Sequence, residues 1–145
     1  LRLKGKGLPS ISYNLKNGGS VLIDRKNKIK ALEDIKTFAQ TVRQNNWSVV
    51  IFAEGTRSRD GLPKPFQKGG LLTLFKEIPD AQIIPVSIGN SWQLSRYNYF
   101  PFPLGIPIIF KFHPLQEINT KAPEETINSL EKMIHQGVNS IQSAS

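Results

Sequence analysis

The stretch SVVIFAEGTRSR, residues 48–59, joins an apolar run directly to a polar loop. Ser48–Phe52 is apolar on both faces, which is typical of a strand buried within a parallel sheet. The residues from Glu54 to Pro65 are polar and contain Gly and Pro, which predicts a loop. In open α/β sheets, ligands bind beyond the carboxyl ends of the strands. This stretch therefore predicts both a class of fold and the position of a site.

The segments on either side alternate between strand and helix patterns. Further strands are predicted at Val21–Ile23, Gln82–Ile88 and Pro107–Phe112. Helices are predicted at Ala31–Asn45, at Lys68–Lys76 and from Pro123 onward, because apolar residues recur every three or four positions and Pro suits a first helical turn. We expect an α/β fold with a mixed, mostly parallel sheet flanked by helices, in one domain over residues 1–145.

Composition limits the chemistry that is available. The 145 residues include no cysteine, which excludes disulfides, thiolate nucleophiles and cysteine-ligated zinc. No metal site is predicted. No apolar run approaches the roughly 18 residues that a membrane-spanning helix needs. The net charge of +8 favours anionic partners, which could be nucleic acid, an anionic membrane surface or a phosphorylated small molecule.

The loop after Ser48–Phe52 carries residue types that suit an anion. Gly55 lets the backbone turn sharply or approach a ligand closely. Thr56 and Ser58 offer hydroxyl donors, and the planar guanidinium of Arg57 can bind a phosphate with two hydrogen bonds. Glu54 can hold Arg57 in place or accept a hydrogen bond from a substrate hydroxyl. We therefore interpret the loop as a phosphate-binding site.

More positive charge lies near this loop. Arg25 follows the predicted strand Val21–Ile23, so it could converge on the same edge of the sheet, and Lys64 and Lys68 come shortly after the loop. A second interpretation of these residues is a solvated turn with a salt bridge between Glu and Arg. The residue types alone leave both interpretations open.

Three blocks of the sequence together resemble a known family. FAEGTRSR, residues 52–59, resembles the third conserved block of the glycerolipid acyltransferases, which make phosphatidic acid from acylated glycerol phosphate. The family usually has Pro where this chain has Ala53. GSVLIDR at residues 19–25 resembles the second block, and IPVSI at residues 84–88 resembles the fourth. The blocks occur in the family's order.

The resemblance implies a function and roles for particular residues. The glycerol phosphate of the acceptor would be bound by Arg25, Glu54, Gly55, Thr56 and Arg57. Pro85 would shape the side of the site that takes the acyl donor. The enzyme would move a fatty acyl group from acyl-CoA or acyl-carrier protein, as a co-substrate with no bound cofactor, to the free hydroxyl of a lysophosphatidic acid-like acceptor. The resemblance also implies association with the cytoplasmic face of a membrane.

The family's first block, HxxxxD, is missing from this chain. In that block a His acts as general base on the acceptor hydroxyl and an Asp orients the imidazole. His113 has Ile118 at the fifth following position and His135 has Ser140. We interpret His113 as a residue at a strand end and His135 as a residue on the polar side of a helix.

Three explanations of the missing block remain open. The chain opens without Met in a basic segment, so we expect the His-Asp dyad upstream of Leu1, in a longer protein of which these residues are the C-terminal part. This fragment alone would then be inactive. The alternatives are a homologue that binds lipid or phosphate without catalysis, and Glu54 as a replacement base.

An aromatic window spans Trp92–Phe102 and has neither helix nor strand periodicity. It could be a loop at the membrane interface, where Trp and Tyr are favoured, or a loop that caps the core beside the site. Stacking of nucleic-acid bases is a third interpretation. No recognised nucleic-acid-binding module accompanies the window, so we do not expect nucleic acid as a partner.

Overall fold

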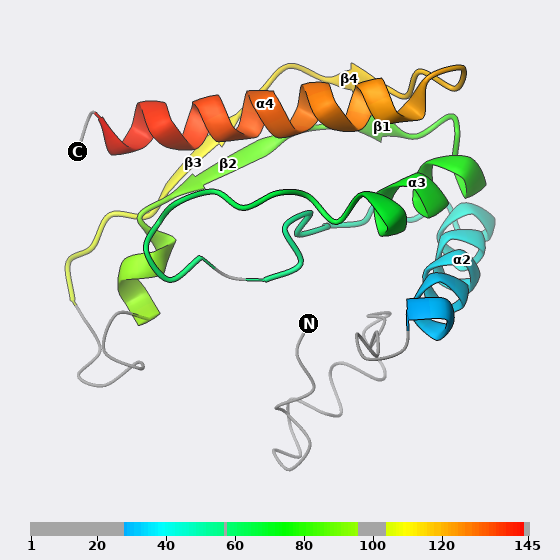
Figure 1. Ribbon diagram of the computed structural model, residues 1–145, viewed down its shortest axis with the longest axis horizontal. Coiled ribbons are helices and arrows are strands. Elements are labelled where there is room, and N and C mark those ends of the chain that lie inside the picture. The colour runs from blue at the N-terminus through cyan, green and yellow to red at the C-terminus, as the bar shows by residue number, and fades with distance from the viewer. Residues whose placement is uncertain (1–27, 57, 96–103, 144–145) are drawn as a thin grey trace, which may run out of the picture. The chain divides into compact units, whose positions relative to one another are not determined.

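A computed structural model of the chain describes residues 28–56, 58–95 and 104–143 (Figure 1). The chain divides into two compact units, the first comprising residues 1–51 and 69–79 and the second residues 52–68 and 80–145. Two of the predicted site residues, Arg25 and Arg57, lie outside the described residues. So do the predicted strand Val21–Ile23 and residues 96–102 of the aromatic window.

Two helices make up most of the described part of the first unit. They are α2, Lys28–Gln44, and α3, Lys68–Glu77, which belongs to this unit from Gly69 onward. The predicted helices at Ala31–Asn45 and Lys68–Lys76 are confirmed to within a few residues. Their apolar stripes provide the buried residues of this unit: Ala39, Val42, Leu71 and Phe75.

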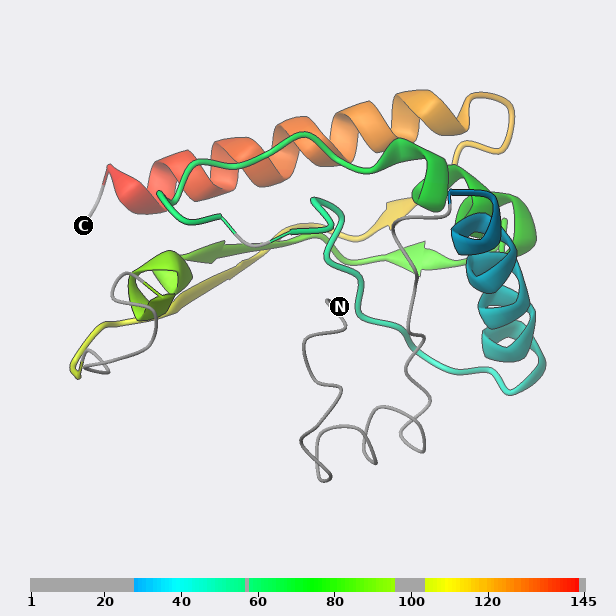
Figure 2. The same ribbon diagram turned by 60° about the horizontal axis from the view of Figure 1, so that its bottom comes forward.

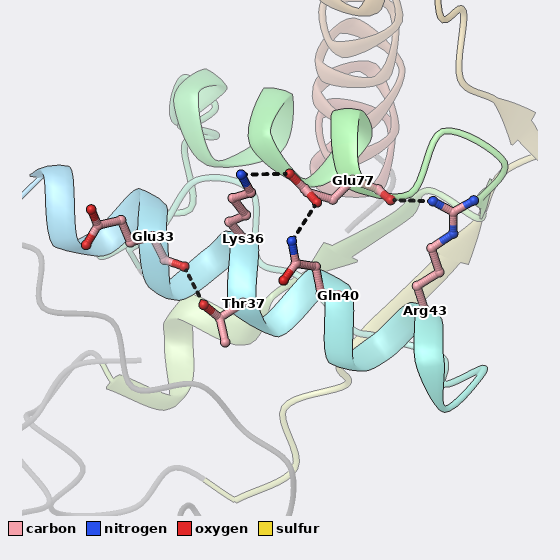
Figure 3. Close-up of polar contacts among 6 residues, drawn as sticks. All are labelled: Glu33, Lys36, Thr37, Gln40, Arg43 and Glu77. Atoms are coloured by element: carbon pink, nitrogen blue, oxygen red, sulfur yellow. Dashed lines mark hydrogen bonds and ion pairs between the residues drawn. The ribbon is translucent and has the colours of Figure 1, made fainter.

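A polar cluster joins the two helices at the end of α3 (Figure 3). The ammonium of Lys36 lies 3.8 Å from one carboxylate oxygen of Glu77, and the amide of Gln40 donates to the other at 3.2 Å. The guanidinium of Arg43 donates to the backbone carbonyl of Glu77 at 3.4 Å. Because the Lys36 side chain is 58% exposed, we expect this ion pair to contribute little to stability.

The strand predicted at Ser48–Phe52 is wrong. These residues form no strand, and the side chains of Val50 and Phe52 are 87% and 68% exposed. A run that is apolar on both faces forms a central strand only when neighbouring strands pair with it. None of the strands within the described residues does so, which explains why the apolar pattern predicted an element that is not there.

The described part of the second unit contains four short strands in two antiparallel pairs. β1, Gln82–Ile83, pairs with β4, Gln116–Glu117, and β2, Val86–Gly89, pairs with β3, Ile109–Phe112. The expectation of a mostly parallel sheet is therefore wrong for the described part of the chain. The broader expectation of a mixed α/β protein is confirmed.

Pro85 divides the strand that was predicted at Gln82–Ile88. Proline has no backbone N–H to donate to a ladder, so strand pairing stops before it and resumes after it. The result is β1 and β2 as separate strands with different partners. The two-residue strand β4 had no readable pattern in the sequence.

The long helix α4, Pro123–Gln142, packs against β2 (Figure 1). Pro123 begins the helix, as predicted, and four apolar side chains on one face are buried: Ile127, Leu130, Val138 and Ile141. Gly137 also lies on this face, where a Cβ would fall 2.7 Å from the Nε2 atom of His113. The absence of a side chain at Gly137 therefore lets the helix approach the strands closely.

The segment that connects α2 to α3 belongs to the second unit from Phe52 to Lys68, and part of it runs along α4. Figure 2 shows the segment 58–68 beside this helix, and Phe66 and Lys64 of the segment are hydrogen-bonded to it. After β2, the short 3₁₀ helix η2, Ser91–Ser95, begins the predicted aromatic window, and Trp92 within it is half-buried. The fold therefore places the predicted phosphate-binding loop against a rigid helix.

Candidate functional site

Gly55 forms the first turn of the loop. Its φ angle is +66°, which favours glycine, and its N–H donates to the carbonyl of Phe52 at 2.9 Å. A Cβ at this position would lie 2.9 Å from the Cγ atom of Gln67. The Gln67 N–H in turn donates to the carbonyl of Ala53 at 2.8 Å. Glycine is therefore needed at position 55 both for the turn and for the close approach of Gln67.

Glu54, which precedes the turn, is half-buried. Burial raises the pKa of its carboxyl above the ordinary value of 4.5. A backbone hydrogen bond from Lys64 and the positive charges of His135 and Lys64 oppose this rise. The sequence suggested Arg57 as the partner of Glu54. Among the described residues, its partner is the backbone of Lys64.

The two hydroxyl residues of the loop differ in their surroundings. Thr56 is exposed, whereas the hydroxyl of Ser58 donates to a carboxylate oxygen of Asp60 at 2.9 Å. The same oxygen accepts the N–H of Leu62 at 3.2 Å. These bonds lower the pKa of the exposed Asp60 and stabilise a local turn. Ser58 thus uses its proton within the loop.

The last two predicted site residues lie at the edges of this region. The ammonium of Lys68 donates to the side-chain carbonyl of Asn128 on α4 at 2.8 Å, and it remains exposed. Pro85 is buried, and its carbonyl accepts the N–H of His113 at 2.9 Å. The roles assigned to these residues by resemblance stay predictions.

His113 is bound to a buried serine. Its Nε2 atom lies 2.8 Å from the hydroxyl of Ser87, which itself donates to the carbonyl of Ile134 at 3.0 Å. A hydroxyl has one proton, so His113 must be the donor in this pair and does not act as a base toward Ser87. Burial and the charge of Lys111 lower the pKa of His113. The pair joins the strands to α4.

His135 lies against the loop, a position that the sequence interpretation missed. Its Nε2 atom is 3.2 Å from the carbonyl of Lys64, so the ring nitrogen carries a proton and donates. Its ring and the Phe66 ring form an edge-to-face contact with a centroid distance of 5.9 Å. The readable signal was the spacing of polar residues on the same helix, which includes Glu131 and Gln142.

Two kinds of feature are absent from residues 28–56, 58–95 and 104–143. They contain no group of three or more His, Asp or Glu side chains that could hold a metal ion. The same segments contain no helix with the length and apolarity needed to cross a bilayer.

The sequence matches a family model described as Acyltransferase over residues 4–89. The chain belongs to the acyltransferase family. The matched range contains the predicted loop, Glu54–Pro65, and also Pro85, whereas α4 begins beyond it. The resemblance found in the three sequence blocks is thus confirmed.

Curated relatives of this acyltransferase chain have a common description. The chain is 33% identical over 117 residues to a 1-acyl-sn-glycerol-3-phosphate acyltransferase of Limnanthes douglasii, covering 79% of the chain and 40% of that protein. It is 33% identical over 114 residues to an enzyme of the same description from Cocos nucifera, covering 78% and 35%. It therefore spans well under half of these relatives. No solved structure matches significantly.

Proposed function

We propose that this chain is the acceptor-binding part of an O-acyltransferase. The reaction moves a fatty acyl group from an acyl thioester to the free hydroxyl of a lysophosphatidic acid-like acceptor. The acceptor oxygen attacks the thioester carbonyl, an ester bond forms, the carbon–sulfur bond breaks, and the thiol of the donor leaves with the proton. The observation that carries the proposal is the acyltransferase match over residues 4–89, which includes the loop.

The loop supplies groups that suit the phosphate of such an acceptor. Its turn at Gly55 is fixed by backbone geometry, and Thr56 is exposed next to it. Arg57 follows directly and offers the bidentate fork that phosphate prefers. Because the turn at Gly55 is already formed, this part of the backbone loses less conformational entropy when a ligand binds. The loop therefore supports acceptor binding.

The proton transfer requires a base that these 145 residues do not provide in the family's form. Neither His113 nor His135 is followed by Asp at the fifth position, and their ring nitrogens Nε2 donate to a hydroxyl and a carbonyl. We propose that the His-Asp dyad lies in residues outside this chain, so that the chain alone binds the acceptor without acylating it. The donor would be acyl-CoA or acyl-carrier protein.

One experiment tests the role of the loop. Binding of lysophosphatidic acid to the chain is measured by isothermal titration calorimetry for the wild type, Arg57→Ala and the control Arg59→Ala. Loss of the bidentate contact should weaken binding by about ten- to a hundredfold in Arg57→Ala. Arg59→Ala should bind within about threefold of the wild type, because Arg59 is an exposed charge near the site. Equal affinity of Arg57→Ala and the wild type would remove Arg57 from the site.

A second function is supported by the missing dyad: a homologue that binds lipid or phosphate without catalysis. The two functions differ in the full-length protein. If it transfers an acyl group from radiolabelled acyl-CoA to lysophosphatidic acid, the protein is an enzyme. If the full-length protein binds the acceptor and shows no transfer, the non-catalytic function is correct.

A further inference from the structure

Four polar side chains form a stripe along α4. Their spacings of three, four and seven residues place them on one face of the helix, as Asn128, Glu131, His135 and Gln142. We call them the polar stripe. All four make hydrogen bonds to residues 61–68, which include the end of the predicted phosphate-binding loop and the three residues after it. Asn128 bonds to Lys68, Glu131 to Phe66, His135 to Lys64 and Gln142 to Gly61.

Three of these bonds go to the backbone of the loop. A carboxylate oxygen of Glu131 accepts the N–H of the buried Phe66 at 2.9 Å. His135 donates to the carbonyl of Lys64 at 3.2 Å. Bonds to backbone groups fix the path of the chain whatever its side chains are. A buried N–H that loses its acceptor is left without a hydrogen bond, so the bond to Glu131 is the more costly one to lose.

The bond from Gln142 holds the far end of the segment. Its amide donates to the carbonyl of Gly61 at 2.7 Å. Gly61 has a φ angle of +85°, and a Cβ there would fall 2.5 Å from the indole nitrogen of Trp92 and 2.9 Å from the amide nitrogen of Gln142. The segment is therefore held at both ends and in the middle by one rigid helix.

Residues 61–68 are in turn hydrogen-bonded to Ala53 and Glu54, which lie before them in the chain. Glu54 accepts a backbone hydrogen bond from Lys64, whose carbonyl is the acceptor for His135. The Ala53 carbonyl accepts the N–H of Gln67, next to Phe66. Residues 61–68, which are bonded to α4, are thus also bonded directly to Ala53 and Glu54, which precede the turn at Gly55.

We propose that the polar stripe of α4 positions residues 61–68, and through them Ala53 and Glu54, for acceptor binding, with Glu131, His135 and Gln142 as positioning residues. The proposal rests on the proposed function of the loop. It gives a specific task to a helix that lies outside the residues matching the acyltransferase family. These residues act on the acceptor through the loop and do not touch it.

Paired variants separate the hydrogen bonds from the volume of the side chains. Glu131→Leu and His135→Leu remove the bonds, and Leu at position 135 keeps an apolar contact with the Phe66 ring. Glu131→Gln retains an acceptor and His135→Gln retains a donor at a comparable distance from the helix. Gln136→Ala, an exposed neighbour on the same helix, is the control.

The measurement is the steady-state kinetics of the full-length protein with lysophosphatidic acid and acyl-CoA. Each Leu variant should raise the KM for lysophosphatidic acid by about five- to tenfold and leave the KM for acyl-CoA unchanged. The Gln variants should return the acceptor KM to within about twofold of the wild type. A role confined to stability would lower the amount of active protein and so kcat, without a selective change in the acceptor KM.

A second readout reports on the loop itself. Hydrogen exchange of the Phe66 amide in the full-length protein should become faster in Glu131→Leu and not in Gln136→Ala, because the N–H loses its acceptor. Unchanged exchange in Glu131→Leu would overturn the proposal at its first step.

The outcomes distinguish this inference from the function on which it rests. If the wild type acylates the acceptor and the Leu variants keep its acceptor KM, the positioning role is wrong and the proposed function stands. If the wild type neither binds nor acylates lysophosphatidic acid, the proposed function fails and the positioning role falls with it, even where Phe66 exchanges faster.

Discussion

Single residues of the loop combine features that stabilise it with features that cost free energy. Gly55 adopts a positive φ angle, and Glu54 is a half-buried carboxyl whose pKa is raised. The sequence indicated both residues as members of a site. It could not indicate the burial of Glu54, because burial depends on residues that are distant in the chain and close in the fold.

Gly55→Ala should destabilise the protein by about 1–2 kcal/mol, since an L residue pays this cost in the left-handed region. The Gln67 side chain must also move, because a Cβ would lie 2.9 Å from its Cγ atom. Gly105→Ala is the matched control, as it has a φ angle of +78° and no atom within 4 Å of the added Cβ. Urea unfolding should show a larger loss for Gly55→Ala; an equal loss would mean that the contact with Gln67 is easily relieved.

Glu54→Gln should change how stability depends on pH. The folded pKa of Glu54 is raised, so its contribution is fully present below the unfolded value of 4.5 and is lost as the pH rises through the folded value. The amide does not titrate. Between about pH 4 and pH 8, the unfolding free energy of the wild type should therefore fall relative to that of Glu54→Gln. Parallel pH profiles from urea unfolding would contradict the raised pKa.

At the scale of elements, the helices followed their sequence patterns more closely than the strands did: strands formed within the predicted ranges Gln82–Ile88 and Pro107–Phe112, but not at Ser48–Phe52. The apolar stripes of α2, α3 and α4 recur at helical spacing, and each helix satisfies its backbone hydrogen bonds internally. A strand needs a partner from elsewhere in the chain. For that reason Ser48–Phe52 could not be settled from its own residues, and neither could the antiparallel pairing of β2 with β3.

Packing between α4 and the strands depends on one position. Gly137→Ala should destabilise the protein by about 1–3 kcal/mol, as overpacking usually does, because a Cβ would meet His113 and Ser87. Gly69→Ala in α3 is the control, where the nearest atom would be 3.9 Å away and alanine should stabilise the helix by up to about 1 kcal/mol. If thermal unfolding shows the same sign for both variants, the close approach at Gly137 is not required.

The contact between α2 and α3 should depend on apolar burial more than on charge. Glu77→Gln should cost less than about 1 kcal/mol, because its ion-pair partner Lys36 is largely exposed to water. Val42→Ala should cost about 1–3 kcal/mol, because Val42 is only 5% exposed and two methyl groups leave a cavity. Denaturation by urea measures both. A loss for Glu77→Gln as large as that for Val42→Ala would show that the polar cluster is the main contact.

At the scale of the whole molecule, net charge is the property that the sequence states most directly. With a charge of +8, the chain should bind vesicles that contain anionic phospholipid and should not bind purely zwitterionic vesicles. Binding should fall by more than about tenfold between roughly 0.05 M and 0.5 M NaCl, because salt screens the attraction. Vesicle co-sedimentation measures this. Binding that is equal on both lipids and independent of salt would contradict an electrostatic membrane association.

The sequence by itself determined the family, the three helices and the residues of the loop. These depend on short-range features: residue order within FAEGTRSR, helical spacing, and Pro123 at a helix start. Only the tertiary structure decided what surrounds the loop. The pairing of strands, the burial of Glu54 and the grip of Glu131 and His135 on the loop all join residues far apart in the chain. Such contacts depend on how the elements pack, and no local pattern in a single sequence specifies that packing.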